Sequence, residues 1–153
     1  MAATRWPTAS PPTGLVELWE QELTGVADLP RVRAHVRTLL TAGPTVTPPP
    51  SDWVERFVLV ADEIASNALR HGSGPVHVRL CADSDSWLVA VTDHAPDAPP
   101  APAMGRAPGA GGYGLHLVAD LTDDHGWHRQ DRHKTVWARM GRAGDGQLGP
   151  SPG

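Results

Sequence analysis

Residues 61–71 read ADEIASNALRH and are the most informative stretch of the chain. Glu63, Asn67 and His71 recur every four residues, and positions four apart on a helix are rotated by only about 40°, so the three share one stripe. Asn67 is the only asparagine in the chain. An amide oxygen suits Mg²⁺, and a carboxylate one turn away can deprotonate a hydroxyl that attacks a phosphate. Taken alone, the pair is equally well explained as the polar edge of an ordinary amphipathic helix.

The helix that carries this stripe is expected over about residues 52–71, because apolar residues recur there at intervals of three and four. Ser51 or Asp52 is expected to cap its start, and Gly72 to end it. A second amphipathic pattern predicts a helix over residues 29–40.

Downstream, alternating apolar runs predict two pairs of strands separated by a short helix at residues 115–121. Residues 15–24 fit either a strand or a short helix. This order of elements predicts an α+β fold, a two-layer sandwich of helices on a mostly antiparallel mixed sheet. The expected strands cover residues 76–81, 87–92, 125–129 and 134–140.

The composition is that of one globular domain, placed here at residues 14–140 of the 153. Residues 1–13 and 141–153 are rich in Pro, Gly and Ser, so we expect them to be disordered. The net charge of -4 argues against direct nucleic-acid binding. No apolar run has the length of a membrane span or signal peptide, so we expect a cytoplasmic protein without membrane contact.

Asp93 ends an apolar strand and opens a loop that extends to Gly112, a length typical of lids and binding loops. A carboxylate at a strand end can accept a hydrogen bond from an adenine amino group, although a plain turn residue is the simpler interpretation. The glycines from Gly109 to Gly114 match G-x-G-x-x-G only formally, because no strand precedes them. They still allow close backbone approach to phosphates at the start of the following helix.

Four segments in order resemble the ATP-binding domain of the GHKL superfamily, which includes the histidine kinases. They read VADEIASNALRHG, VTDHAP, GGYGLHLVADLTDDHGW and KTVWARM, and the resemblance covers residues 29–140. It is greatest to the small bacterial anti-sigma-factor serine/threonine kinases and their single-domain relatives. The resemblance therefore implies the same two-layer ATP-binding fold, with ATP and Mg²⁺ bound between the helices and the sheet.

Carried over residue by residue, the resemblance implies a general base, a metal ligand, an adenine site and a phosphate site. The sequence departs from the family pattern at two places. In the segment VTDHAP, His94-Ala95-Pro96 follows Asp93, where relatives often have a glycine. Position 113 is Tyr, where many relatives have Arg. Arg106, in the expected lid, is a candidate to replace that arginine, although no motif in the sequence assigns it this role. The implied roles are Glu63 as base, Asn67 as Mg²⁺ ligand, Asp93 and Thr135 at the adenine, and Gly112, Gly114, Leu115 and His71 at the phosphates.

The function implied by the resemblance is an ATP-dependent serine/threonine protein kinase that regulates transcription. It would phosphorylate or sequester a protein partner, either a sigma factor or an anti-anti-sigma-like antagonist. Homodimer formation stays open. One alternative is a nucleotide-gated adaptor without phosphotransfer, and another is a degenerate site in a protein that acts purely by sequestration.

Overall fold

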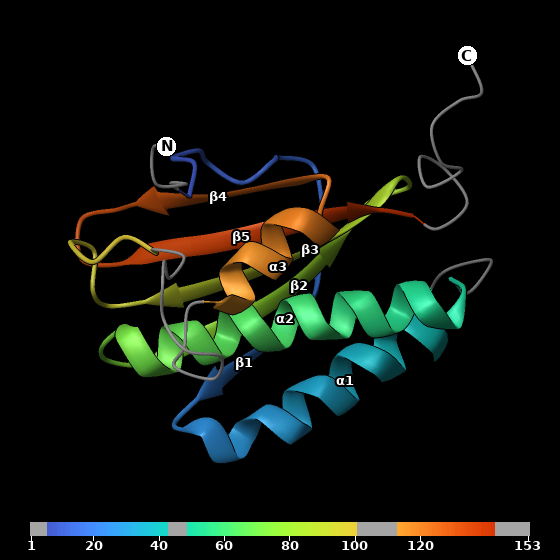
Figure 1. Ribbon diagram of the computed structural model, residues 1–153, viewed down its shortest axis with the longest axis horizontal. Coiled ribbons are helices and arrows are strands. Elements are labelled where there is room, and N and C mark those ends of the chain that lie inside the picture. Colours follow the sequence, from blue (N-terminus) through green and yellow to red (C-terminus); the bar gives the residue numbers. More distant parts are fainter. Residues whose placement is uncertain (1–5, 43–48, 101–112, 143–153) are drawn as a thin grey trace.

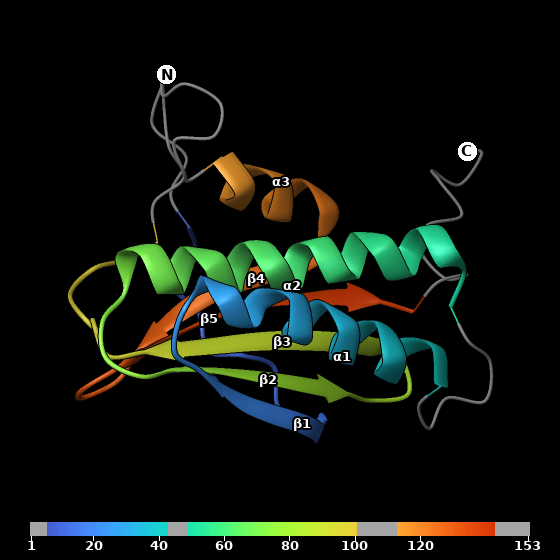
Figure 2. The ribbon, with the colours of Figure 1, turned by 90° about the horizontal axis from the view of Figure 1, so that it is seen from below.

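A computed structural model describes residues 6–42, 49–100 and 113–142 of the chain. Five strands form one sheet in the order β1-β2-β3-β5-β4, and all four neighbouring pairs are antiparallel. The helices lie together over one face of this sheet (Figures 1 and 2). The elements are β1 (Val16–Leu23), a 3-10 turn (Val26–Asp28), α1 (Leu29–Ala42), α2 (Ser51–His71), β2 (Val76–Ala82), β3 (Ser86–Asp93), α3 (Tyr113–Leu121), β4 (Asp124–Arg129) and β5 (Lys134–Gly141).

The expected α+β sandwich is confirmed, and α2 is the helix at its centre. It packs against α1 and α3 as well as against β2, β3 and β5. Its apolar stripe is buried because every third or fourth residue faces the sheet, as the periodicity predicts. The buried residues of this helix are Trp53, Val54, Phe57, Val58, Val60, Ala61, Ile64, Ala65, Ser66 and Ala68.

Two ion pairs fix α1 against the outer side of α2. The Arg37 guanidinium donates to both carboxylate oxygens of Glu55, at 2.8 and 2.9 Å. Arg33 lies 2.7 Å from Asp62, the residue that precedes Glu63. These contacts are at least partly exposed, so each contributes little to stability, but together they define how the two helices are aligned.

Successive side chains along each strand point to opposite faces of the sheet, and both faces carry buried apolar residues. The helix-facing positions of β3 and β5, among them Val89, Val91 and Val136, belong to the main core. On the other face Cys81, Leu88, Ala90 and Trp137 form a smaller cluster, against which Leu15 packs. Cys81 is a small buried strand residue, as its position in an apolar run suggests.

Residues 6–13, expected to be disordered, instead lie along the edge of β4. Trp6 is 4% exposed and belongs to the main core. The Trp127 N–H donates to the carbonyl of Pro7, and the Ala9 N–H donates to the carbonyl of Trp127. The Trp137 indole N–H reaches the carbonyl of Ala9 at 2.8 Å. These bonds satisfy an otherwise open strand edge, which explains why a segment of loop-like composition is held in place.

The start of α2 also differs from the expectation. Pro50 occupies the N-cap position, and no side chain there accepts a hydrogen bond. Ser51 and Asp52 are already inside the helix, and Asp52 pairs with Arg56 one turn later. The carboxylate of Asp52 therefore complements the helix dipole rather than capping the helix. Among the described residues, no helix has the length and apolar character needed to span a membrane.

Candidate functional site

The middle of α2 faces the beginning of α3, and this contact brings together four of the residues singled out in the sequence. Glu63 and Asn67 line a narrow recess with Gly114 and Leu115. Ser66 and Arg70 complete its walls, and the recess is too narrow to admit a water molecule. The stripe on α2 and Gly114 in the first turn of α3 therefore meet in space, and the first turn of a helix is where backbone N–H groups can bind a phosphate.

Gly114 lies against the Glu63 side chain so closely that any larger residue would require Glu63 to change its side-chain conformation. A Cβ placed on Gly114 would overlap the Glu63 carboxylate, and it would lie 3.0 Å from Glu63 Cγ. Leu115, the next residue of α3, is 1% exposed and anchors this helix in the main core. The distance between the two helices at this point is thus determined by the absence of a side chain at position 114.

The environment of Glu63 favours its protonated form. Burial raises the pKa of the Glu63 carboxyl above its ordinary value of 4.5, and the neighbouring Asp62 charge raises it further. Arg70 acts in the opposite direction. A carboxylate with a raised pKa is a stronger base, so this position suits proton abstraction better than an exposed glutamate would.

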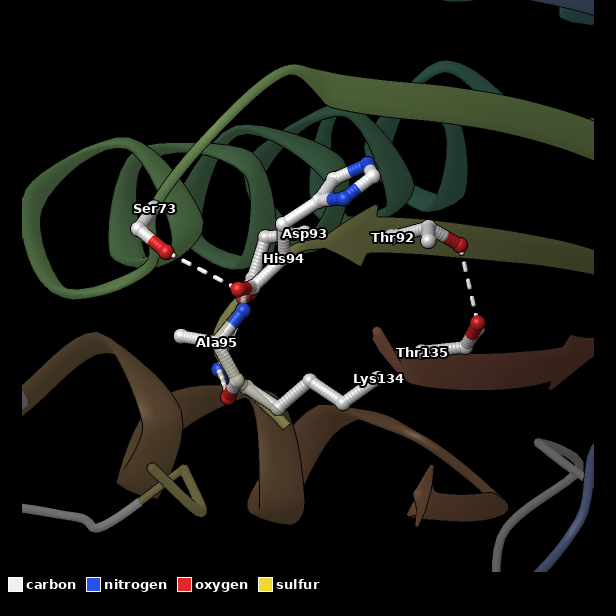
Figure 3. A network of polar contacts seen from close by, with 7 residues as sticks. All are labelled: Ser73, Thr92, Asp93, His94, Ala95, Lys134 and Thr135. Atoms are coloured by element: carbon white, nitrogen blue, oxygen red, sulfur yellow. Dashed lines mark hydrogen bonds and ion pairs between the residues drawn. The ribbon is translucent and has the colours of Figure 1, made fainter. Parts of the chain in front are cut away.

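The residues that follow α2 are hydrogen-bonded to the residues that follow β3. The His94 N–H donates to the carbonyl of Ser73 at 2.7 Å, and the Ser73 hydroxyl donates to the carbonyl of His94 at 2.9 Å (Figure 3). This double contact presses Gly72 onto Asp93: a Cβ on Gly72 would lie 2.7 Å from Asp93 Oδ2. Asp93 is consequently held beside the helix that carries Glu63 and Asn67.

Asp93 forms a buried ion pair with Lys134, its direct partner across β3 and β5. The Lys134 ammonium lies 3.0 Å from each carboxylate oxygen, and the side chains of Lys134 and Asp93 are only 4% and 1% exposed. Oδ1 also accepts the Ala95 N–H at 2.8 Å. Oδ2 is also buried and lies 3.0 Å from the same ammonium, although the geometry of this contact is not that of a hydrogen bond. Lys134 therefore balances the charge of both oxygens, and Oδ2 can accept a further hydrogen bond from a ligand.

Thr135 is separated from Asp93 by the sheet. Residues of β5 alternate between the faces, and Thr135 lies on the side of Trp137, away from the helices. Its hydroxyl is 2.8 Å from that of Thr92. The resemblance placed Thr135 near an adenine, but the structure puts Lys134 beside Asp93 instead. Lys134 was missed by the sequence reasoning, although it is the only lysine in the chain.

Of the remaining predicted residues, the structure fully describes only His71. His71 is the exposed last residue of α2, one turn beyond Asn67. Gly112 and Arg106 lie outside the described residues, as does the side chain of Tyr113. The described part of the site is therefore Glu63, Asn67, Gly114, Leu115 and Asp93, with Lys134 added.

The residues present fit a magnesium nucleotide in chemistry, and one part of the site must open to receive it. Asn67 and Glu63 are hard oxygen donors of the kind that Mg²⁺ prefers. Asp93 Oδ2 lacks a well-aligned hydrogen-bond donor, although the Lys134 ammonium is 3.0 Å away, and a carboxylate oxygen suits the amino group of a nucleobase. The recess between Glu63 and Gly114 is closed, so a phosphate would enter only if α3 moved away from α2.

Comparison with known proteins gives a match over most of the chain. Residues 26–140 match the model of the histidine kinase-like ATPase domain. No curated protein matched the chain. The crystal structure of the RsbU and RsbW domains of Rv1364c from Mycobacterium tuberculosis is similar, with a TM-score of 0.52 and 16% sequence identity. The match covers 80% of this chain but only 32% of that chain, so the likeness concerns the fold of one part of it. The family model covers well over half of the sequence, and the chain therefore belongs to the histidine kinase-like ATPase domain family.

Proposed function

We propose that the chain binds Mg-ATP between α2, α3 and the ends of β3 and β5. The observation that carries this proposal is the arrangement of acceptors along α2. Glu63 and Asn67 face the start of α3, and Gly72 at the helix end contacts Asp93. Gly72 follows Glu63 by nine positions along α2 and its C-cap, a rise of about 13.5 Å, which is comparable with the length of a nucleoside triphosphate.

In this arrangement the adenine of ATP would lie at Asp93, and its phosphates would lie at Gly114 and Leu115. The start of α3 supplies backbone N–H groups with no partner inside the helix, and these favour anions. The amide oxygen of Asn67 would hold Mg²⁺, which offsets the negative charge of the phosphates when bound. The resemblance adds Gly112 and His71 at the phosphates.

We further propose that the bound ATP serves phosphorylation of a serine or threonine on a protein partner. Glu63 would accept the proton of the attacking hydroxyl, whose oxygen forms a bond to the γ-phosphorus as the bond to ADP breaks. The partner class suggested by the family resemblance is a sigma factor or its anti-anti-sigma-like antagonist, which makes the chain a regulator of transcription. The raised pKa of Glu63 supports the role of base.

A second candidate function is a nucleotide-gated adaptor that docks a partner without phosphotransfer. The closed recess favours it, because entry of a triphosphate would separate Gly114 from Glu63 and so change the surface of α3. The two functions differ in one product. Release of ADP that depends on Glu63 is expected of the kinase and not of the adaptor.

The first test is calorimetric titration of Mg-ATP into the wild type and into Asn67→Ala and His35→Ala. We expect micromolar to millimolar binding by the wild type and at least tenfold weaker binding by Asn67→Ala, corresponding to about 1.4 kcal/mol. His35 is exposed on α1 and stacks on Trp19, remote from the recess, so His35→Ala is the matched control. Wild-type protein that binds no Mg-ATP contradicts the proposal.

A further inference from the structure

The first described residues of the chain form a strap on the edge of the sheet, which we define as residues 6–13. Its backbone pairs with β4: the Pro7 carbonyl accepts the Trp127 N–H at 2.9 Å, and the Ala9 N–H donates to the Trp127 carbonyl at 2.8 Å. The Ala9 carbonyl also accepts the Trp137 indole N–H at 2.8 Å. The strap carries no charged side chain, so apolar packing and these hydrogen bonds hold it in place.

Two histidines of β4 contact the side chains of the strap. The imidazole of His125 packs against the indole of Trp6, with ring centroids 4.5 Å apart and planes inclined by 46°. His128 Nδ1 lies 3.2 Å from the Ser10 hydroxyl. Trp6 is buried, and its indole N–H has no acceptor among the described residues. The side chain that anchors the strap therefore rests on a titratable ring.

The hydrogen bonds of Thr122 determine which nitrogen of the neutral His125 ring carries the proton. A threonine hydroxyl has one proton to donate, and that of Thr122 donates to the Val118 carbonyl at 2.8 Å. His125 Nδ1 lies 3.3 Å from the same hydroxyl oxygen, so Nδ1 carries the ring proton and donates it to this oxygen. Nε2 is then the nitrogen that takes up a further proton. The resulting charge would lie on a half-buried ring that packs against Trp6.

The surroundings of His125 oppose this charge. Burial lowers the pKa of the imidazole below its ordinary value of 6.5, and the neighbouring Asp124 raises the pKa by a smaller amount. Asp124 lies 4.0 Å from Arg139, so its own charge is partly balanced. Across the ladder β5 presents Ala138, and the strap presents the uncharged Trp6. Three further titratable groups on α3 and the turn after it do not shift this pKa: His116, Asp120 and Asp123. The neutral ring therefore suits this position better than the charged one.

We propose that His125 is an acid-sensitive switch for the strap: its neutral ring holds Trp6 in the core, and its protonated ring releases residues 6–13 while the rest of the domain stays folded. A charge regains its hydration when the strap leaves, and this gain exceeds the attraction between a cation and the face of an indole. A ring whose pKa is lower with the strap in place favours docking above that pKa and disfavours it as the pH falls. Release uncovers the edge of β4, where the Trp127 N–H and carbonyl become free to pair with another strand. The inference does not depend on the proposed nucleotide site.

The test measures the protection of the Trp137 indole N–H from hydrogen exchange, because this group is bonded to the strap. Labelling with ¹⁵N-tryptophan gives an indole signal for each of the six tryptophans, and Trp137→Phe identifies the one required. Each rate is divided by the intrinsic exchange rate at the same pH. We expect protection to fall roughly tenfold between about pH 7.5 and about pH 5.5, since a released histidine with the ordinary pKa of 6.5 is then about ten times more often charged than neutral. The backbone N–H groups of β3 should stay protected.

Two variants separate the effect of His125 from that of its neighbour. His125→Asn keeps an N–H near the position of Nδ1 and cannot become charged, so its protection should change by less than about twofold over the same pH range. His128→Asn is the matched control because His128 also contacts the strap, and it should keep the roughly tenfold fall. Four results overturn the inference: constant protection in the wild type, an undiminished fall in His125→Asn, loss of the fall in His128→Asn, or a parallel loss of protection in β3.

His125→Asn removes the ring that packs against Trp6 and can loosen the strap at every pH, so a second measurement uses the wild type. The ring C–H signals of His125 report its protonation. They should titrate together with the Trp137 indole signal, at a midpoint below pH 6.5. Titration of His125 without a response of Trp137, or a response of Trp137 at a different pH, contradicts the proposal.

Discussion

Replacement of Gly114 by alanine tests the closest contact of the site. A Cβ at this position would overlap the Glu63 carboxylate and approach Glu63 Cγ to 3.0 Å, whereas carbon atoms in contact prefer about 3.5–4.0 Å. The overlapping atoms are the end of a flexible side chain, so Glu63 can turn away. Forcing a side chain out of its rotamer costs about 0.5–1.5 kcal/mol. Alanine in a helix gains about 0.5–1 kcal/mol over glycine, so the net change in stability is expected to be within about 1 kcal/mol.

The contact itself is isolated by making the same change in a Glu63→Ala background. The overlap is then absent, and only the gain of about 0.5–1 kcal/mol from the alanine should remain. Urea unfolding of the four proteins gives the coupling free energy between the two positions, expected at about 0.5–1.5 kcal/mol, the rotamer cost. Additive effects, with a coupling below about 0.3 kcal/mol, would show that Gly114 does not lie on Glu63.

The functional consequence of Gly114→Ala should exceed its effect on stability. If Glu63 is the base, displacing its carboxylate by about 1 Å is expected to lower phosphotransfer on the order of 100-fold. The assay is transfer of labelled phosphate to the cognate partner once it is identified, with ADP release as the second readout. Gly25→Ala is the matched control because a Cβ on Gly25 meets nothing within 4 Å. Full phosphotransfer by Gly114→Ala would remove Glu63 from the mechanism.

Three further predictions concern stability. Gly72→Ala should destabilise the fold by about 1–3 kcal/mol in urea unfolding, because its Cβ would lie 2.6 Å from the Ala68 carbonyl and 2.5 Å from Asp93 Cγ; a change below about 0.5 kcal/mol contradicts this packing. The pKa of Glu63 is raised above 4.5, so ionisation of this carboxyl disfavours folding. Glu63→Gln should therefore be more stable than the wild type at pH 7 and equal to it below pH 4.5. A difference in unfolding free energy that stays constant across this pH range would refute the prediction. Burial lowers the pKa of His125 below its ordinary value of 6.5, and the charge of Asp124 opposes this shift. The free energy of unfolding of the wild type should therefore decrease as pH falls below 6.5, and that of His125→Gln should decrease less. Parallel curves of unfolding free energy against pH for the two proteins would refute this.

The elements that form the core were predictable because their apolar patterns are local. The pattern of α2 has a period close to that of a helix over its whole length, and the structure differs from the expected start by one residue. The stretch at residues 15–24 was undecided, and it forms the edge strand β1. Its side chains are mostly exposed or half-buried, so neither alternation nor helical periodicity is clear.

Two features could not be read from the sequence because each depends on distant residues. The segment around Trp6 has the composition of a loop, and it is ordered by β4 and β5, more than a hundred residues later. Lys134 and Thr135 are neighbours, and a shift of one residue in strand register decides which of them faces Asp93. The register follows from the pairing of β3 with β5, two strands that are far apart in the sequence.

The position of Trp6 has a consequence for synthesis of the protein on the ribosome. Its segment bonds to Trp127 and Trp137, so the first described residues of the domain acquire partners only after nearly all of it has been translated. Closing so long a loop is entropically costly and makes this docking a late event. Until then an indole that belongs to the core stays exposed on the nascent chain, where a chaperone can recognise it. Docking of Trp6 thereby reports that β4 and β5 have been made.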